Sequence, residues 1–118
     1  MAEAARNPLV HAKISGLYSA AGEPASWSVA SIRPYIESAV ELFGPGRLMY
    51  GGDWPVSVTA GGYERIWGDI STILGELPQE DRDQILGGTA HRFYRIDDAL
   101  LARAVEASAA NERTGAQA

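Results

Sequence analysis

Apolar residues recur at three- and four-residue steps in two separate segments of the chain, which is the spacing of one face of an α-helix. In the first segment Ser31 is placed to cap the start, Pro34 falls in the first turn, and Gly44 follows the last turn. The second segment ends at Pro78. We therefore predict two amphipathic helices, each with one buried face. Their apolar stripes are Ile32, Tyr35, Ile36, Ala39, Val40 and Phe43, and then Tyr63, Ile66, Trp67, Ile70, Leu74 and Leu77.

Two short segments rich in β-branched and apolar residues lie on either side of the first helix. They are Leu9–Ser15 and Arg47–Gly51, and both are predicted to be strands. Between the first strand and the helix, residues 18–30 are rich in small residues and lack either period, so we expect a loop over one face of the fold. Strand, helix and strand in this order predict a βαβ unit with parallel strands and a right-handed crossover.

The C-terminal third is predicted to contain short helices. A segment that begins with acidic residues, 78–86, favours one helix, because carboxylates are stabilising near a helix N-terminus. Residues 87–96 indicate a further helical turn capped by Thr89 and closed by packing of Phe93 and Tyr94. The alanine-rich stretch Asp98–Ala107 is expected to be helical, and residues 108–118 are expected to fray.

Composition narrows the class of protein. With 118 residues, 46% of them hydrophobic and 21% charged, the chain is typical of one soluble globular domain. The net charge is −5, and the nine arginines and the single Lys13 form no basic block, so we expect no nucleic-acid partner. There are no cysteines, which excludes disulfides, thiolate metal ligands and thiol nucleophiles. No apolar run has membrane-spanning length and the first ten residues lack a secretory pattern, so we expect no membrane association and a cytoplasmic location.

The segment RLMYGGDWPV places one carboxylate, Asp53, directly after the second predicted strand. In parallel α/β folds, functional groups gather at the carboxyl ends of the strands. Gly51 and Gly52 permit unusual backbone dihedrals there, and Pro55 restricts the residue before it. A carboxylate aimed in this way suits a general base or a metal ligand. The alternative interpretation, that Asp53 is a turn residue and Trp54 a packing residue, is open on this evidence.

Three segments together resemble one family. HAKISGLYS, LFGPGRLMYGGDWPV and ILGGTAHRFYRI are similar to the C-terminal part of the amidohydrolase-related (amidohydrolase 2) proteins, a group that includes sugar-lactone and dicarboxylate-lactone hydrolases. The resemblance covers Pro8 to Ile96. It implies an α/β fold, an incomplete (β/α)8 TIM barrel consisting of the last two strands with their helices and a C-terminal helical tail. On this basis residues 1–96 are the end of the barrel domain and residues 97–118 are the tail.

The resemblance also implies roles for particular residues. Asp53 matches the aspartate after the last barrel strand, which in metal-using members contacts the metal and handles the proton of the attacking water. A divalent metal such as zinc is thus implied for the family, although we expect this chain alone to bind none. The family commonly has Ser where Gly52 stands and Asn where Thr89 stands, and we expect neither change to disable the site.

Other candidates for the site are less specific. Members of the family carry a His-x-His pair and further histidines, whereas this chain has only His11 and His91, which we interpret as structural residues. Lys13 either points into the barrel mouth, or caps a sheet edge or forms a salt bridge. Trp54 and Trp27 are candidates for the wall of a substrate pocket, with aromatic packing as the alternative for Trp27.

The chain is too short to close a barrel, since an eight-stranded barrel takes about 250 residues. We therefore expect a partner that supplies the N-terminal half-barrel, or self-association. Two functions from different classes remain open. One is a hydrolase that acts on a lactone or a similar ester or amide carbonyl through activated water. The other is a non-catalytic fragment or interaction module, which we favour for the isolated chain.

Overall fold

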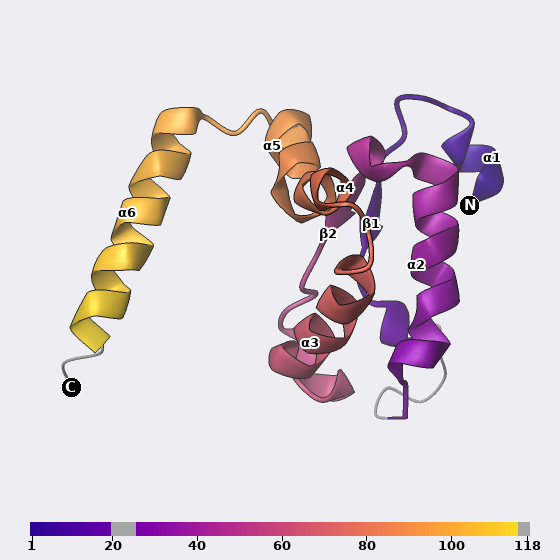
Figure 1. Cartoon of the computed structure of the whole chain (residues 1–118), viewed down its shortest axis with the longest axis horizontal. Helices are drawn as coiled ribbons and strands as arrows, with labels where there is room; N and C mark the ends of the chain where they lie inside the picture. Colours follow the sequence, from indigo (N-terminus) through magenta and orange to yellow (C-terminus); the bar gives the residue numbers. More distant parts are fainter. Residues whose placement is uncertain (20–25, 116–118) are drawn as a thin grey trace.

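The computed structural model describes residues 1–19 and 26–115 of the chain and shows an α/β fold with a two-stranded sheet (Figure 1). The part of the loop prediction that covers residues 20–25 lies outside the described residues, as do residues 116–118. Among the described residues, no helix combines the length and the apolar character that crossing a membrane requires. The elements in chain order are α1 Ala2–Ala5, β1 Ala12–Ile14, the 3₁₀ helix η1 Leu17–Ser19, α2 Val29–Phe43, η2 Pro45–Arg47, β2 Leu48–Tyr50, η3 Val56–Ala60, α3 Tyr63–Leu74, α4 Gln79–Asp83, the π-helical turn η4 Gln84–Gly88, α5 Thr89–Tyr94 and α6 Asp98–Gly115.

The two strands pair in parallel, as the sequence pattern predicts. Ala12 pairs with Leu48, and the ladder runs for three residue pairs. Both strands are shorter than predicted. β1 is short because Val10 is held in a turn by Asn7 and Gly16 leaves the extended conformation at φ 63°, and β2 begins after Arg47, which belongs to η2. His11 consequently precedes β1 and does not lie inside it as expected.

A core of buried apolar residues joins α2 and α3 to one face of the sheet. Helix α2 buries Ile32, Ile36, Ala39 and Phe43 of the predicted stripe, whereas Val40 is partly buried and Tyr35 is 41% exposed. Helix α3 ends at Leu74, three residues earlier than Leu77, with Gly75 as its C-cap. The fully buried side chains of this core include Ile14, Ile32, Ile36, Leu48, Leu74 and Ile85.

The start of α2 differs from the prediction. Ser28 is the N-cap, and it forms a capping box with Ser31, whose hydroxyl accepts from the Ser28 amide at 2.8 Å. This reciprocal pair adds residues at the N-terminal end of the helix, so Pro34 lies inside the helix and not in its first turn. Because proline has no amide proton, the carbonyl of Ala30 lacks its usual helical partner, but Ala30 is exposed and water can take that place.

The C-terminal helices also depart from the prediction in detail. The chain is helical from Gln79 to Tyr94, with a π-turn between α4 and α5. Thr89 is not the N-cap of α5 but its first residue: its backbone is helical, and its buried hydroxyl donates to the carbonyl of Pro45 at 2.9 Å. Helix α6 extends away from the other elements (Figure 1) and continues to Gly115, beyond the predicted end at Ala107 and through residues that were expected to fray.

Candidate functional site

The chain leaves β2 through two glycines and turns sharply at Asp53. The backbone of Asp53 has φ 52°, in the left-handed region that only a few residue types tolerate, aspartate among them. Its main-chain carbonyl accepts from the amide of Ser57 at 2.8 Å, and the Trp54–Pro55 peptide between them is cis. The turn hydrogen bond therefore uses the backbone of Asp53 and leaves its carboxylate available for other contacts.

That carboxylate meets a tyrosine from the end of the other strand. The hydroxyl of Tyr18, in η1, donates to Oδ2 of Asp53, and the Tyr18 side chain is only 4% exposed. Burial raises the pKa of Tyr18 to about 12, and the adjacent Asp53 carboxylate contributes to the same shift. The phenol is thus protonated near neutral pH and acts as a hydrogen-bond donor.

Sequence reasoning did not single out Tyr18. A signal was present, because Tyr18 follows the first strand and Asp53 follows the second, and the carboxyl ends of parallel strands lie at the same edge of a sheet. Gly16 completes this arrangement. A Cβ atom on Gly16 would lie 3.2 Å from Oδ2 of Asp53, so a larger residue would crowd the carboxylate.

The other predicted site residues lie in different environments. Trp54 is adjacent to Asp53 and 76% exposed. Trp27 is buried: its indole N–H donates to the carbonyl of Ala60 at 2.9 Å, and the guanidinium of Arg65 lies over its ring at 4.6 Å. The Trp27 ring is 6.4 Å from that of Tyr18, so Trp27 packs behind the tyrosine that contacts Asp53.

Lys13 and the two histidines are held by other contacts. Lys13 is exposed on β1, where it pairs in register with Met49, and its ammonium lies 5.4 Å from the ring of Tyr94. The centroids of the His11 and Phe93 rings are 4.7 Å apart. Nε2 of His91 in α5 lies 2.9 Å from Oδ1 of Asp98.

A metal site does not fit this chain by itself. The described residues contain no group of three or more His, Cys, Asp or Glu that could hold a metal ion together. A hydrolytic zinc requires about three protein ligands. Here Asp53 is a single carboxylate, and its Oδ2 is already bound to Tyr18.

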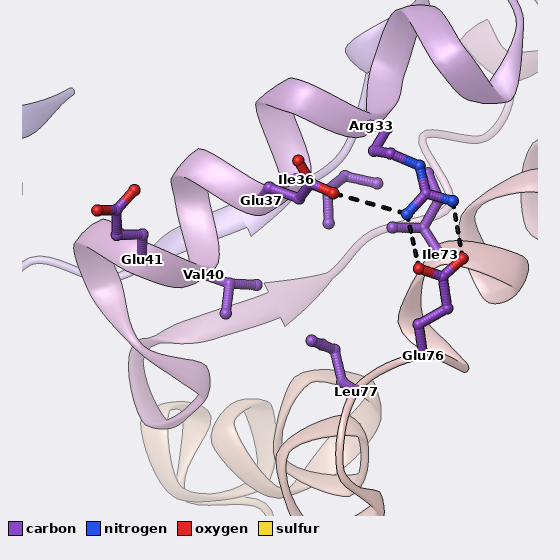
Figure 2. A pocket seen from close by; sticks show the side chains of 8 residues that line it. All are labelled: Arg33, Ile36, Glu37, Val40, Glu41, Ile73, Glu76 and Leu77. Carbon is purple, nitrogen blue, oxygen red and sulfur yellow. Dashed lines mark hydrogen bonds and ion pairs between the residues drawn. The ribbon is translucent and has the colours of Figure 1, made fainter.

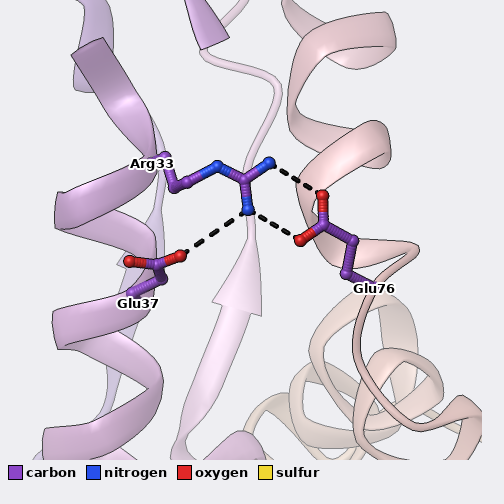
Figure 3. A network of polar contacts seen from close by, with 3 residues as sticks. All are labelled: Arg33, Glu37 and Glu76. Carbon is purple, nitrogen blue, oxygen red and sulfur yellow. Dashed lines mark hydrogen bonds and ion pairs between the residues drawn. The ribbon is translucent and has the colours of Figure 1, made fainter. Parts of the chain in front are cut away.

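Two cavities of the described structure lie away from Asp53. One, of about 250 Å³, is a groove between α2 and the end of α3 (Figure 2). At its rim Arg33 forms a bidentate pair with Glu76, both distances being 2.7 Å, and approaches Glu37 at 3.6 Å (Figure 3). Another, of about 610 Å³, lies between α5 and the start of α6, near His91 and Leu101. Neither includes a residue of the Asp53 site.

Comparison with known proteins identifies one family and several relatives of this chain. The model of a family described as Amidohydrolase matches residues 1–96. The chain is 37% identical over 105 residues to L-fucono-1,5-lactonase of Burkholderia ambifaria and 35% identical over 106 residues to L-fucono-1,5-lactonase of Burkholderia multivorans. These matches cover 82% and 86% of this chain, but only 34% and 36% of the relatives.

Solved structures show the same relation. An amidohydrolase from Burkholderia multivorans, solved with bound Zn, superimposes with a TM-score of 0.75 at 32% identity, over 81% of this chain and 35% of that one. A second crystal form of an amidohydrolase from this species, with bound HEPES, gives the same values. The chain therefore spans about a third of the length of the relatives it matches.

Proposed function

The chain belongs to the amidohydrolase family, and from this premise we propose that it carries the C-terminal part of a hydrolase that opens a lactone, or a similar ester or amide carbonyl, by attack of an activated water. In this proposal residues 1–96 are the end of a (β/α)8 barrel domain, β1 and β2 are its last two strands, and residues 97–118 are a helical tail. The family match and the lactonase relatives support a hydrolase over a non-catalytic module.

The open two-stranded sheet supports the proposal that further strands complete it. Parallel sheets are normally buried on both faces, and a strand without a neighbour exposes unpaired backbone groups. In the described structure the sheet has two strands, and Lys13 is exposed on the face opposite the core formed with α2. We propose that an N-terminal half-barrel, or a second copy of the chain, covers this face and pairs with the open edges.

Asp53 is the proposed catalytic residue, and the observation that carries this role is its carboxylate at the end of β2, oriented by the hydroxyl of Tyr18. The carboxylate takes one proton from water as the water oxygen bonds to the lactone carbonyl carbon. The ring C–O bond then breaks, and the released alkoxide takes back the proton from Asp53, so one water and one lactone give one hydroxy acid and the carboxylate is regenerated. General-base catalysis of this kind contributes about a hundred- to ten-thousand-fold to the rate.

The remaining site residues have supporting roles in the proposal. Exposed Trp54 lines the substrate pocket next to Asp53, Trp27 supports that wall from behind Tyr18, and Lys13 faces the barrel interior. The bound Zn of the related amidohydrolase supports a divalent metal in the assembled enzyme. Asp53 is the ligand this chain would contribute, and the others would come from the N-terminal part.

The test is a fusion enzyme. The N-terminal two-thirds of the Burkholderia multivorans L-fucono-1,5-lactonase is joined to this chain in place of its own matching third, and hydrolysis of L-fucono-1,5-lactone is measured. In an active fusion, Asp53→Asn is expected to lower kcat by about a hundred- to ten-thousand-fold. Asparagine tolerates the left-handed backbone of this position and its amide oxygen still accepts from Tyr18, so the thermal midpoint should stay near that of the parent.

The matched control is Asp83→Asn, which changes an exposed carboxylate at the end of α4. It should leave both kcat and the thermal midpoint unchanged. An active fusion in which Asp53→Asn turns over at the parent rate would return Asp53 to the role of a turn residue and remove the proposed mechanism.

A further inference from the structure

We infer that Tyr18 is a positioning residue for Asp53, which fixes the direction of the carboxylate and leaves its second oxygen to act on water. This inference rests on the proposed function of Asp53. The phenol comes from η1 after β1, and the carboxylate comes from the turn after β2, 35 residues later in the chain. Tyr18 is buried, so its hydroxyl reaches the site from within the protein and not from the substrate side.

The position of the phenol is set by the packing behind it. Its ring lies against buried Trp27, whose indole is tied to the carbonyl of Ala60 in η3. Arg65 donates to the main-chain carbonyl of Trp27 at 2.7 Å and lies over its ring. These contacts connect the tyrosine to η3 and α3, the elements that follow Asp53 in the chain. The donor and the acceptor are therefore held by the same packed unit.

The backbone before Tyr18 makes room for the carboxylate. Gly16 has φ 63°, a conformation that glycine adopts at little cost, and its missing side chain is what lets Oδ2 of Asp53 approach. The amide and the hydroxyl of Ser19 both donate to the carbonyl of Gly16, at 3.2 and 2.7 Å, which closes this segment into a tight turn. Residues 16–19 thus form a cradle on one side of the Asp53 carboxylate.

The hydrogen bond from Tyr18 leaves one oxygen of the Asp53 carboxylate for chemistry. An ionised carboxylate has two oxygens, and a donor bound to Oδ2 restrains rotation of the group about its side-chain bonds. Oδ1 then keeps one direction and holds its lone pairs for the proton of water. Because Tyr18 is buried behind the carboxylate, losing its hydroxyl should impair the chemical step and leave substrate binding intact. A misplacement of about 1 Å at a reacting group can cost on the order of a hundredfold in rate.

The first part of the test needs no activity and uses the 118-residue chain. Proton NMR should show a downfield hydroxyl resonance that is absent in Tyr18→Phe and shifted in Asp53→Asn. With ¹³C-labelled aspartate, the Cγ signal of Asp53 should move in Tyr18→Phe. Tyr35→Phe, at an exposed tyrosine on α2, is the matched control and should leave both signals in place. An Asp53 signal that ignores the loss of the Tyr18 hydroxyl would overturn the inference.

The second part uses the fusion enzyme. Tyr18→Phe should lower kcat by about ten- to a hundredfold, within the range for a misplaced catalytic group, with KM changed less than about twofold. Tyr35→Phe should match the parent. If Asp53→Asn abolishes turnover while Tyr18→Phe keeps the parent kcat, the positioning role is refuted and the proposed function stands. If Asp53→Asn is silent, the proposed function fails, and the positioning role falls with it.

A variant that retains both the ring and the hydroxyl guards against a folding failure of Tyr18→Phe. Incorporation of 3-fluorotyrosine at position 18 keeps the packing against Trp27 and makes the hydroxyl a stronger donor. The Asp53 Cγ signal should then shift in the direction opposite to its shift in Tyr18→Phe, which removes the donor. Absence of any shift would count against the hydrogen bond.

Discussion

Replacing Arg47 with methionine is expected to lower the free energy of unfolding of the chain by about 2–4 kcal/mol. Arg47 is the last residue of η2, directly before β2, and its guanidinium donates to main-chain carbonyls of two segments. Its Nε donates to the carbonyl of Phe43, at the end of α2, at 3.0 Å. Its Nη1 donates to the carbonyls of Ala5 and Asn7, each at 3.0 Å. Arg47 therefore joins the N-terminal segment to the C-terminus of α2.

The magnitude follows from these bonds. A hydrogen bond to a charged group contributes about 1.5–3 kcal/mol. Arg47 makes five such bonds, and the three shortest would give roughly 5–9 kcal/mol if they were independent. The true value is smaller because Arg47 is only partly buried, and water can solvate the freed carbonyls in the variant. Two of the three bonds also share one nitrogen. Methionine keeps most of the apolar stem, which isolates the contribution of the guanidinium.

Urea unfolding of the 118-residue chain, followed by circular dichroism, measures this loss. The thermal midpoint should also fall by roughly 8–20 °C, since 1 kcal/mol corresponds to about 4–5 °C in a domain near this size. Limited proteolysis should release the first ten residues sooner than in the parent. Arg6→Met, at an exposed arginine, is the matched control. If Arg47→Met and Arg6→Met unfold within about 0.5 kcal/mol of each other, the carbonyl contacts do not stabilise the fold.

Two further predictions concern ionisable groups. The guanidinium of Arg33 holds the pKa of the Glu76 carboxyl below its ordinary value of 4.5. A depressed folded-state pKa means that this stabilisation is present above pH 4.5 and is lost as the pH falls through the lowered pKa. At neutral pH the thermal midpoint of the parent should thus exceed that of Glu76→Gln by a small margin that salt reduces. This difference should vanish in acid. A difference that does not depend on pH would contradict the assignment. Calorimetric titration of the 118-residue chain with zinc should show only weak binding, because a hydrolytic site needs about three convergent ligands. Tight one-to-one binding would refute the view that the other ligands lie outside the chain.

Elements whose pattern depends on neighbouring residues were predictable from the sequence. The stripe of Ile66, Ile70 and Leu74 predicts α3, and all three side chains are buried. The order strand, helix, strand predicts the parallel pair, which the register of Ala12 with Leu48 confirms. The motif after the second strand placed Asp53 at a strand end, and together with two other segments it led to the family. The helix and strand inferences use residues within a few positions of one another, where helix and strand periods apply.

The start of α2 shows where such local signals compete. Ser28 and Ser31 are both good caps, and the helix uses Ser28 as the cap and Ser31 as its reciprocal partner. The pair of bonds outweighs the preference of Pro34 for the first turn. In the same way, Thr89 has the chemistry of a cap, but packing of the π-turn against η2 directs its hydroxyl to Pro45.

By itself, then, the sequence determined the two long amphipathic helices, the parallel strand pair, the family and the carboxylate after β2. The tertiary structure alone decided which side chains meet: Tyr18 with Asp53, 35 residues apart, and Arg33 with Glu76, 43 apart. The physical reason is the range of the forces that set them. Periodicity arises from backbone geometry over three or four residues, whereas a long-range hydrogen bond forms only after apolar burial has brought separate elements together. Tyr18 becomes a donor to Asp53 because packing against Trp27 removes it from water.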